Sequence, residues 1–231
     1  MERGANRNRS MSDPQFHPRG ARPLWTLRAE FLILYLLVPL IFALAVTPRL
    51  LFPMLFAMMI GGFALLHLTP GFRWRELLLG RVDLRLVLAF LLVSGLVLTA
   101  FVFWLTPGSF LQLPRLQPGL MLTIALFYPL LSALPQEVLF RALYFRRYRP
   151  FLPRGLPGIL LNAALFAWAH LLYWNWVAVA VTFLGGIAFA YGYKRGGGFG
   201  TAVLMHAAAG LLLFALGLGR YFYSGAVIRP F

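Results

Sequence analysis

Long apolar stretches separated by short polar turns recur along the whole chain. We expect seven membrane-spanning helices, because each stretch approaches or exceeds the roughly 20 residues that cross a bilayer. The expected spans are about 31–47, 50–68, 86–106, 119 to the basic run at 146, 157–173, 177–193 and 199–217. The pattern predicts an all-α, polytopic membrane bundle in which residues 29–231 form a single transmembrane domain.

The segments outside the spans are polar or amphipathic. Residues 1–28 are rich in arginine and proline, and we expect a flexible basic tail. A cleaved signal peptide is the alternative, because Ala43, Leu44 and Ala45 resemble a cleavage site. Residues 71–81 predict a short interfacial helix with Trp74 at the level of the headgroups.

Composition supports a membrane protein. Hydrophobic residues make up 61% of the chain and charged residues 12%, about half the charged share of an ordinary soluble domain. The chain has no cysteine, which excludes disulfides and thiolate metal sites.

The formal net charge of +15 raises the question of nucleic-acid binding, which needs a basic patch on a folded surface. The Lys and Arg residues are instead concentrated in every second segment between the expected spans. The N-terminal tail and the second, fourth and sixth connections hold 16 of the 21 Lys and Arg residues. Cytoplasmic loops carry such an excess. We therefore expect a cytoplasmic N-terminus, an outside C-terminus, a lipid bilayer as partner and no nucleic acid.

Glu137 is the only acidic residue inside an expected span, and Arg141 follows it by four positions. Residues four apart share one face of a helix. A charge at the bilayer centre costs roughly 2.5–3.5 kcal/mol on insertion scales, so charged residues in spans usually mark a functional site. The structural alternative is an ion pair that merely packs the bundle.

Two histidines lie in later spans. His170 shares a helix face with Phe166 and Asn162, and His206 has small neighbours that permit close approach of helices. At about 1.5 Å per residue, Glu137 and His206 lie at similar depths from the basic ends of their spans. We therefore expect Glu137, His170 and His206 to surround one polar cavity open to the cytoplasm. An interfacial histidine and a histidine bonded between helices are the structural alternatives.

The order of these residues resembles the CPBP intramembrane proteases, which include CAAX prenyl endopeptidases and the bacterial bacteriocin-processing or Abi proteins. The resemblance covers roughly residues 122–214 and rests on three short patterns: Glu137 with Arg141, Phe166 with His170, and a late His206. It implies an intramembrane endopeptidase with a protease-like core at about 119–217, in a bacterial inner (cell) membrane.

Two positions depart from the family pattern. The family usually has paired glutamates, but here Gln136 precedes Glu137, as in a bacterial-type branch with a Gln-Glu motif. The family usually has Asn or another polar residue four positions after the second histidine, where this chain has Gly210. Asn162 or Asn175 is a candidate substitute for that polar residue.

Peptide hydrolysis needs a base for water and a positive or donor group at the developing oxyanion. Glu137 is the base by elimination, with His170 positioning the water and His206 donating to the oxyanion. Two histidines and one glutamate also form a familiar zinc set, so zinc stays open as a cofactor. The substrate would be a membrane-associated protein or peptide. The rival functions are a non-catalytic scaffold or immunity-type member of the same fold and a small proton-coupled transporter.

Overall fold

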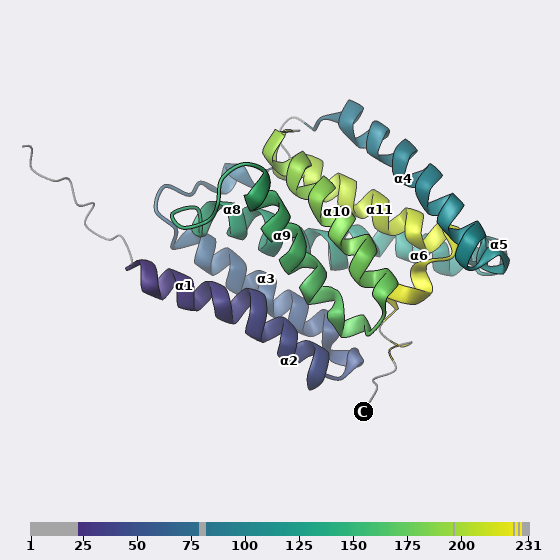
Figure 1. Ribbon diagram of the computed structural model, residues 1–231, viewed down its shortest axis with the longest axis horizontal. Helices are drawn as coiled ribbons and strands as arrows, with labels where there is room; N and C mark the ends of the chain where they lie inside the picture. Colours follow the sequence, from purple (N-terminus) through teal and green to yellow (C-terminus); the bar gives the residue numbers. More distant parts are fainter. Residues whose placement is uncertain (1–22, 79–81, 196, 224, 226, 228–231) are drawn as a thin grey trace, which may run out of the picture.

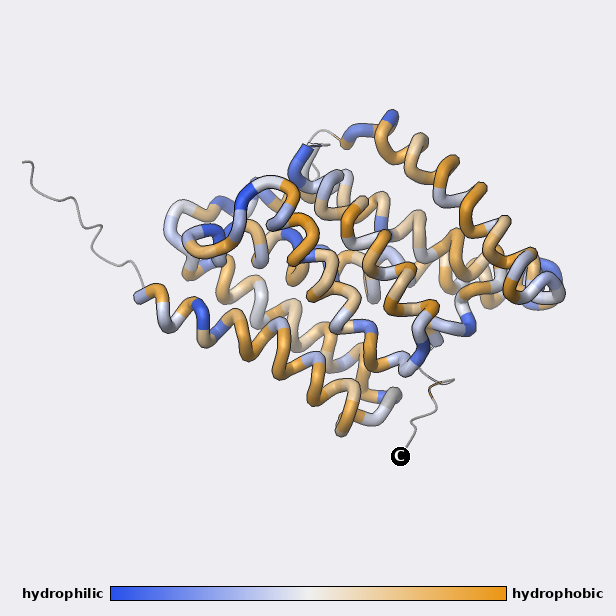
Figure 2. Tube along the Cα trace, in the orientation of Figure 1, coloured by the Kyte–Doolittle hydropathy of each residue, from blue (hydrophilic) through white to orange (hydrophobic). Residues whose placement is uncertain are grey.

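The computed structural model describes residues 23–227, apart from 79–81, 196, 224 and 226. Most of the expected basic tail, residues 1–22, lies outside the described residues, as do 228–231. Every regular element in the described part is helical, which confirms the all-α expectation. Hydrophobic residues dominate the helices, and the hydrophilic positions gather mostly near their ends (Figure 2).

Within the described residues, six helices are long and apolar enough to cross a membrane: Leu24–Leu44, Leu84–Leu105, Pro118–Arg147, Leu156–Tyr173, Trp176–Arg195 and Phe199–Leu216. The seventh expected span is the apolar helix α3, Leu51–His67, which has 17 residues. At 1.5 Å per residue α3 is about 25 Å long, so it is slightly short for the hydrocarbon core. The expected boundaries agree within a few residues for the last five spans.

The elements follow the chain in a simple order. The first span comprises α1 (Leu24–Leu32), a π-helical segment η1 (Ile33–Leu37) and α2 (Val38–Leu44), and it is followed by η2 (Pro48–Leu50), α3, η3 (Trp74–Glu76) and α4 (Leu84–Leu105). The connection to the fourth span contains η4 (Pro107–Ser109) and α5 (Gln112–Leu116), and the fourth span consists of α6 (Pro118–Tyr128), η5 (Pro129–Ala133), α7 (Leu134–Glu137), η6 (Val138–Leu143) and α8 (Tyr144–Arg147). The remaining elements are α9 (Leu156–Ala169), η7 (His170–Tyr173), α10 (Trp176–Arg195), α11 (Phe199–Leu216) and η8 (Gly219–Phe222).

Helix α11 lies at the centre of the bundle. It packs against α10, α4 and the segments of the fourth span, while α10 packs on α9 (Figure 1). In its most apolar window 61% of the residues are buried, compared with 11% for α4 at the periphery. A residue on α11 can therefore contact side chains from several spans, whereas most of α4 is left to face lipid.

The first span differs from its expected bounds, because it begins at Leu24 rather than Phe31. Glu30 therefore lies within a span, which corrects the expectation that Glu137 is the only acidic residue in one. Arg147 donates to Glu30 through two nitrogens, with Nη2 2.7 Å from Oε2, and Tyr148 Oη donates to Oε1 at 2.7 Å. This partly buried pairing offsets the cost of the charge.

The segment after α3 also differs from expectation. The predicted interfacial helix over 71–81 is reduced to a short 3₁₀ turn, Trp74–Glu76, and residues 79–81 lie outside the described part. The carboxylate of Glu76 accepts from its own turn at Arg73 N, 3.1 Å away, and pairs with Arg146 Nε at 3.2 Å. The polar side of the segment is thus tied to the fourth span, and Trp74 remains half exposed.

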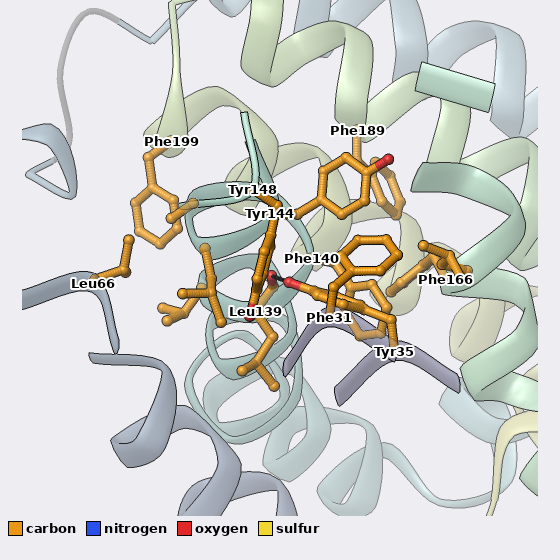
Figure 3. Close-up of a cluster of buried hydrophobic side chains, with 14 of the residues drawn as sticks. Phe31, Tyr35, Leu66, Leu139, Phe140, Tyr144, Tyr148, Phe166, Phe189 and Phe199 are labelled. Atoms are coloured by element: carbon orange, nitrogen blue, oxygen red, sulfur yellow. Dashed lines mark hydrogen bonds between the residues drawn. The ribbon is translucent and has the colours of Figure 1, made fainter. Parts of the chain in front are cut away.

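An aromatic cluster joins the first span to the end of the fourth. Phe31 and Tyr35 pack against Phe140, Tyr144 and Tyr148, with ring centroids 4.9–5.9 Å apart across the set (Figure 3). Tilted and edge-on rings of this kind add about 0.5–1.5 kcal/mol per pair beyond burial. The cluster holds the helix turns that carry the charged residues of the fourth span.

Candidate active site

Glu137 is the last residue of α7 and lies between two π-helical segments of the fourth span. Pro129 and Pro135 interrupt this helix, since proline removes a backbone N–H from the hydrogen-bond ladder. The Glu137 side chain is fully buried. His206 Nδ1 lies 2.8 Å from its Oε1, and Arg141 Nε lies 3.3 Å from its Oε2. One carboxylate therefore contacts a cation on its own helix and an imidazole on α11.

Arg141 is also fully buried. Its guanidinium carbon lies 4.8 Å from the ring centroid of Phe166 and 5.7 Å from that of Phe189. Aromatic faces attract a desolvated cation by about 2 kcal/mol or more. Phe166 and Phe189 thus help to hold the Arg141 charge beside Glu137, away from water.

His170 begins the 3₁₀ turn that follows α9, and its Nδ1 lies 2.7 Å from the carbonyl oxygen of Phe166. The Phe166 ring meets both imidazoles nearly edge-on, with centroids 4.6 Å from His170 and 5.5 Å from His206. Phe189 stacks on His206 with centroids 4.8 Å apart. Phe166 therefore lies between the two histidines and contacts Arg141 as well, so the four predicted residues with Phe166 form one cluster.

The hydrogen bonds fix which ring nitrogen of each histidine carries the proton. A carbonyl oxygen and an ionised carboxylate can only accept. His170 Nδ1 must therefore donate to Phe166 O, and His206 Nδ1 must donate to Glu137 Oε1. In the neutral rings both Nε2 atoms then carry a lone pair. Two imidazole acceptors are consequently available for bonding to water.

A cavity of about 970 Å³ adjoins this cluster. His170, His206 and Gln136 line it, but Glu137 does not. Most of the wall is apolar. The polar side chains that the fourth span contributes are Thr123 and three that are spaced four residues apart: Tyr128, Ser132 and Gln136. His206 therefore lies between the buried carboxylate and the cavity.

The cavity extends away from the arginine-rich end of the bundle. Its wall includes residues of the connection around Ser109 and Gln112, the turn at Tyr173, and the segment after α11 that contains Arg220 and Tyr223. Among the residues that the structure describes, the lining includes none from the connections 69–78, 82–83, 148–155 and 197–198, which adjoin or hold the basic runs. With an N-terminus in the cytoplasm, the cavity would open on the opposite side, contrary to the expected cytoplasmic opening.

Of the three predicted supporting amides, Gln136 lines the cavity, whereas Asn162 and Asn175 only bond to the backbone of the bundle. Gln136 lines the cavity and its Nε2 donates to Ser132 Oγ at 3.0 Å. Asn162 is fully buried, and its Nδ2 donates to the carbonyl oxygen of Phe140 at 2.6 Å. Asn175 caps α10, accepting from Ala178 N at 2.8 Å. Neither asparagine lines the cavity, so neither substitutes for a side chain at Gly210.

The donor set does not form a metal site in this arrangement. Among the residues that the structure describes, no group of three or more His, Asp or Glu side chains could hold a metal ion. The Nδ1 of His206 and an oxygen of Glu137 are bonded to each other, and Arg141 pairs with the second oxygen.

Two aromatic residues of the site are not predicted from the sequence. Tyr128 lies edge-on to His206, with ring centroids 6.2 Å apart, and Phe189 stacks on the same ring. The regular spacing of Tyr128, Ser132 and Gln136 along one helix face was a readable signal. Phe189 lies in the apolar helix α10, and no feature of the sequence distinguishes it from the other apolar residues there.

Residues 118–212 match the family model described as Type II CAAX prenyl endopeptidase Rce1-like. The match runs from the start of α6 into α11 and includes every predicted site residue. No curated protein and no solved structure matches the chain. The resemblance to the CPBP family is thereby confirmed for this segment, together with the CAAX-protease type of helical fold.

Proposed function

We propose that the chain is an intramembrane endopeptidase that cleaves a membrane-associated protein or peptide by attack of water. The observation that carries the proposal is the 2.8 Å contact between Glu137 and His206, since His206 also lines a large cavity inside an apolar bundle. A carboxylate behind an imidazole that faces a substrate-sized cavity is an arrangement suited to general-base catalysis.

In the proposed reaction His206 Nε2 takes a proton from water, and the water oxygen attacks the carbonyl carbon of the peptide. His170 Nε2 accepts the second hydrogen of that water and orients it. As the C–N bond breaks, His206 returns its proton to the leaving nitrogen, which yields an amine and a carboxylate. Glu137 does not line the cavity, so it acts through His206 by fixing the tautomer and stabilising the imidazolium.

Arg141 has a separate role in this mechanism. Its positive charge balances the negative charge of Glu137, so the pair of side chains carries no net charge. The proposed reaction starts from a neutral His206, whose Nε2 accepts the proton of water. This refines the expectation that Glu137 itself contacts the water, because the carboxylate is fully buried behind the imidazole.

The shape of the cavity supports access for the substrate from the sparsely charged end of the bundle. The wall there is formed by α5, η4 and the segment after α11. Large apolar walls suit an unwound segment of a membrane-associated chain, whose side chains stay in a non-aqueous environment. With the proposed topology the substrate would enter the cavity from the side of the membrane that faces away from the cytoplasm.

The proposal is tested by labelling new protein N-termini in membranes from cells that produce the unaltered chain, Glu137→Gln or Glu76→Gln. Glu76→Gln is the matched control, because it makes the same chemical change in a partly exposed carboxylate outside the site. We expect a set of N-termini that appears with the unaltered chain and the control and is absent with Glu137→Gln at equal protein levels. Identical sets from all three would contradict the endopeptidase proposal.

The non-catalytic scaffold has one observation in its favour. The residue of the Gln-Glu pair that faces the cavity is Gln136, whose amide cannot take a proton from water at neutral pH. If the scaffold function holds, Glu137→Gln will leave the cellular role of the protein intact wherever the variant folds. The same comparison of N-termini therefore separates the two functions.

A further inference from the structure

Gly210 lies one helical turn after His206 on α11 and is buried against Tyr128. A Cβ atom at Gly210 would lie 2.1 Å from Cε1, 2.2 Å from Cζ and 2.4 Å from Oη of Tyr128. Real Cβ atoms do not approach other atoms so closely. The phenol end of Tyr128 therefore occupies the space that a side chain at position 210 would fill.

The position of Tyr128 is fixed from two sides. Its ring packs edge-on against His206 and against Phe214, with centroid separations of 6.2 Å and 5.9 Å. Ser132 lies one turn along the same helix and lines the cavity with it. Ser132 in turn accepts from Gln136 at 3.0 Å. Tyr128 is thus a polar wall residue held beside the proposed base.

The hydrogen-bond directions leave the site short of a donor. Both histidines use Nδ1–H to bond protein acceptors, and their neutral Nε2 atoms can only accept. Hydrolysis of a peptide requires a donor where negative charge develops on the carbonyl oxygen, and preorganised donors are usually the largest single contribution to such catalysis. A phenol supplies an O–H donor that stays neutral at physiological pH.

We propose that Tyr128 is a catalytic residue whose hydroxyl donates a hydrogen bond to the oxyanion of the tetrahedral intermediate, in the space left by Gly210. The inference rests on the proposed endopeptidase function. The proton stays on the Tyr128 oxygen throughout, and the negative charge collapses back when the C–N bond breaks. Gly210 is the residue that lets the phenol reach this position.

The first test is Tyr128→Phe, which removes the hydroxyl and keeps the ring in its place. The probe is a quenched fluorescent peptide that spans a Glu137-dependent cleavage site, reconstituted with the full chain in phosphatidylethanolamine and phosphatidylglycerol vesicles. We expect kcat to fall by about 10²–10³-fold, the usual loss for one oxyanion donor, with KM unchanged. Tyr191→Phe is the control, because Tyr191 is 49% exposed and does not line the cavity.

The second test moves the donor from the fourth span to α11. Tyr128→Ala empties the space beside Gly210, and adding Gly210→Asn supplies an amide N–H there. The matched control adds Gly210→Leu, which fills the space with an apolar side chain. We expect kcat of the double variant with Gly210→Asn to be at least tenfold higher than that of Tyr128→Ala. The double variant with Gly210→Leu should regain folding stability, but its kcat should stay as low as that of Tyr128→Ala.

The outcomes separate the two proposals. Unchanged kcat in Tyr128→Phe, or equal recovery by the Asn and Leu double variants, would overturn the role of Tyr128 while cleavage by the unaltered chain still supports the endopeptidase. If no cleavage site depends on Glu137, both proposals fail together. Thermal unfolding of each purified variant shows whether a loss of rate comes from misfolding, and the Asn–Leu comparison holds even where Tyr128→Ala alone is unstable.

Discussion

The hydroxyl of Tyr35 in the first span donates to the carbonyl oxygen of Leu139 in the fourth, with the two oxygens 2.7 Å apart (Figure 3). Leu139 belongs to the π-helical segment η6, which directly follows Glu137. A π segment disturbs the regular backbone ladder, and such segments are frequent at functional sites. Tyr35 bonds Leu139, and Asn162 bonds the next carbonyl, that of Phe140, at 2.6 Å. Two other spans therefore hold the turn that carries Glu137 and Arg141.

Tyr35→Phe is expected to destabilise the fold by about 1–3 kcal/mol, the cost of leaving a buried acceptor without its partner. The ring packing against Phe31 and Phe140 is kept, so the change isolates the hydrogen bond. The measurement is unfolding of the purified protein in mixed micelles with increasing SDS. Tyr191→Phe serves as the control because Tyr191 is 49% exposed. Equal midpoints for the two variants would show that the Leu139 carbonyl is satisfied in another way.

The buried charge pair at the site predicts a non-additive pair of variants. Arg141→Met leaves Glu137 as an uncompensated buried charge and is expected to cost about 3–5 kcal/mol. Adding Glu137→Gln removes the second charge, and the double variant is expected to regain most of that stability while remaining inactive. SDS unfolding of the two single variants and the double variant gives the coupling free energy. A double variant as unstable as the sum of its single changes would show that the pair is not coupled.

Much of the architecture could be predicted from the sequence. The thickness of the bilayer sets the length of a membrane-spanning helix, and apolar stretches of that length mark the spans. The similar depths of Glu137 and His206, counted from the basic ends of two different spans, predicted that the two side chains converge. The structure places His206 Nδ1 2.8 Å from Glu137 Oε1. The helix around Glu30 was harder to read. Its charge interrupts the apolar pattern, and its partner Arg147 lies 117 residues away in the chain.

The side chains at the cavity were less predictable for a geometric reason. Whether Glu137 or Gln136 faces the cavity depends on how the π segments turn the fourth helix, and sequence periodicity assumes a regular helix. The match between Gly210 and Tyr128 depends on how two helices cross. Neither relation has a signature within a single segment, so the sequence pointed to the cluster without giving the contacts of its atoms.

Arg147 is expected to be a structural residue that fixes the first span to the fourth. Besides Glu30, its Nη1 donates to Leu65 O at 3.0 Å and to Thr69 Oγ1 at 3.1 Å, so one side chain links α1, α3 and α8. Arg147→Ala should cost about 3–5 kcal/mol because it leaves a partly buried carboxylate with fewer partners. Arg149→Ala, in the exposed turn two residues on, should change stability by less than about 0.5 kcal/mol. Thermal unfolding of both variants in one detergent makes the comparison, and similar losses would contradict the assignment.

Removal of metal is expected to leave cleavage unchanged. The oxygens of Glu137 are engaged by His206 and Arg141, which leaves the carboxylate poorly placed as a third ligand. Vesicles that contain the chain are incubated with 1,10-phenanthroline, or with its non-chelating 1,7 isomer as the control, before the peptide assay. Loss of activity with the chelator alone, and recovery on addition of Zn²⁺, would restore the zinc hypothesis and require a different arrangement of Glu137 and His206.

The orientation of the protein in the membrane decides from which side a substrate reaches the cavity. Because the chain has no cysteine, single substitutions give unambiguous labelling sites. Arg149→Cys lies in the basic connection before α9, and Gly108→Cys lies in the exposed turn before α5, near the far end of the cavity. We expect a membrane-impermeant maleimide added to intact cells to label Gly108→Cys and not Arg149→Cys, since basic connections stay in the cytoplasm.

Permeabilised cells, in which both cysteines should react, provide the control for reactivity. Labelling of Arg149→Cys alone would reverse the orientation and place the mouth of the cavity in the cytoplasm, whereas labelling of both in intact cells would mean that an odd number of membrane crossings does not separate these two connections.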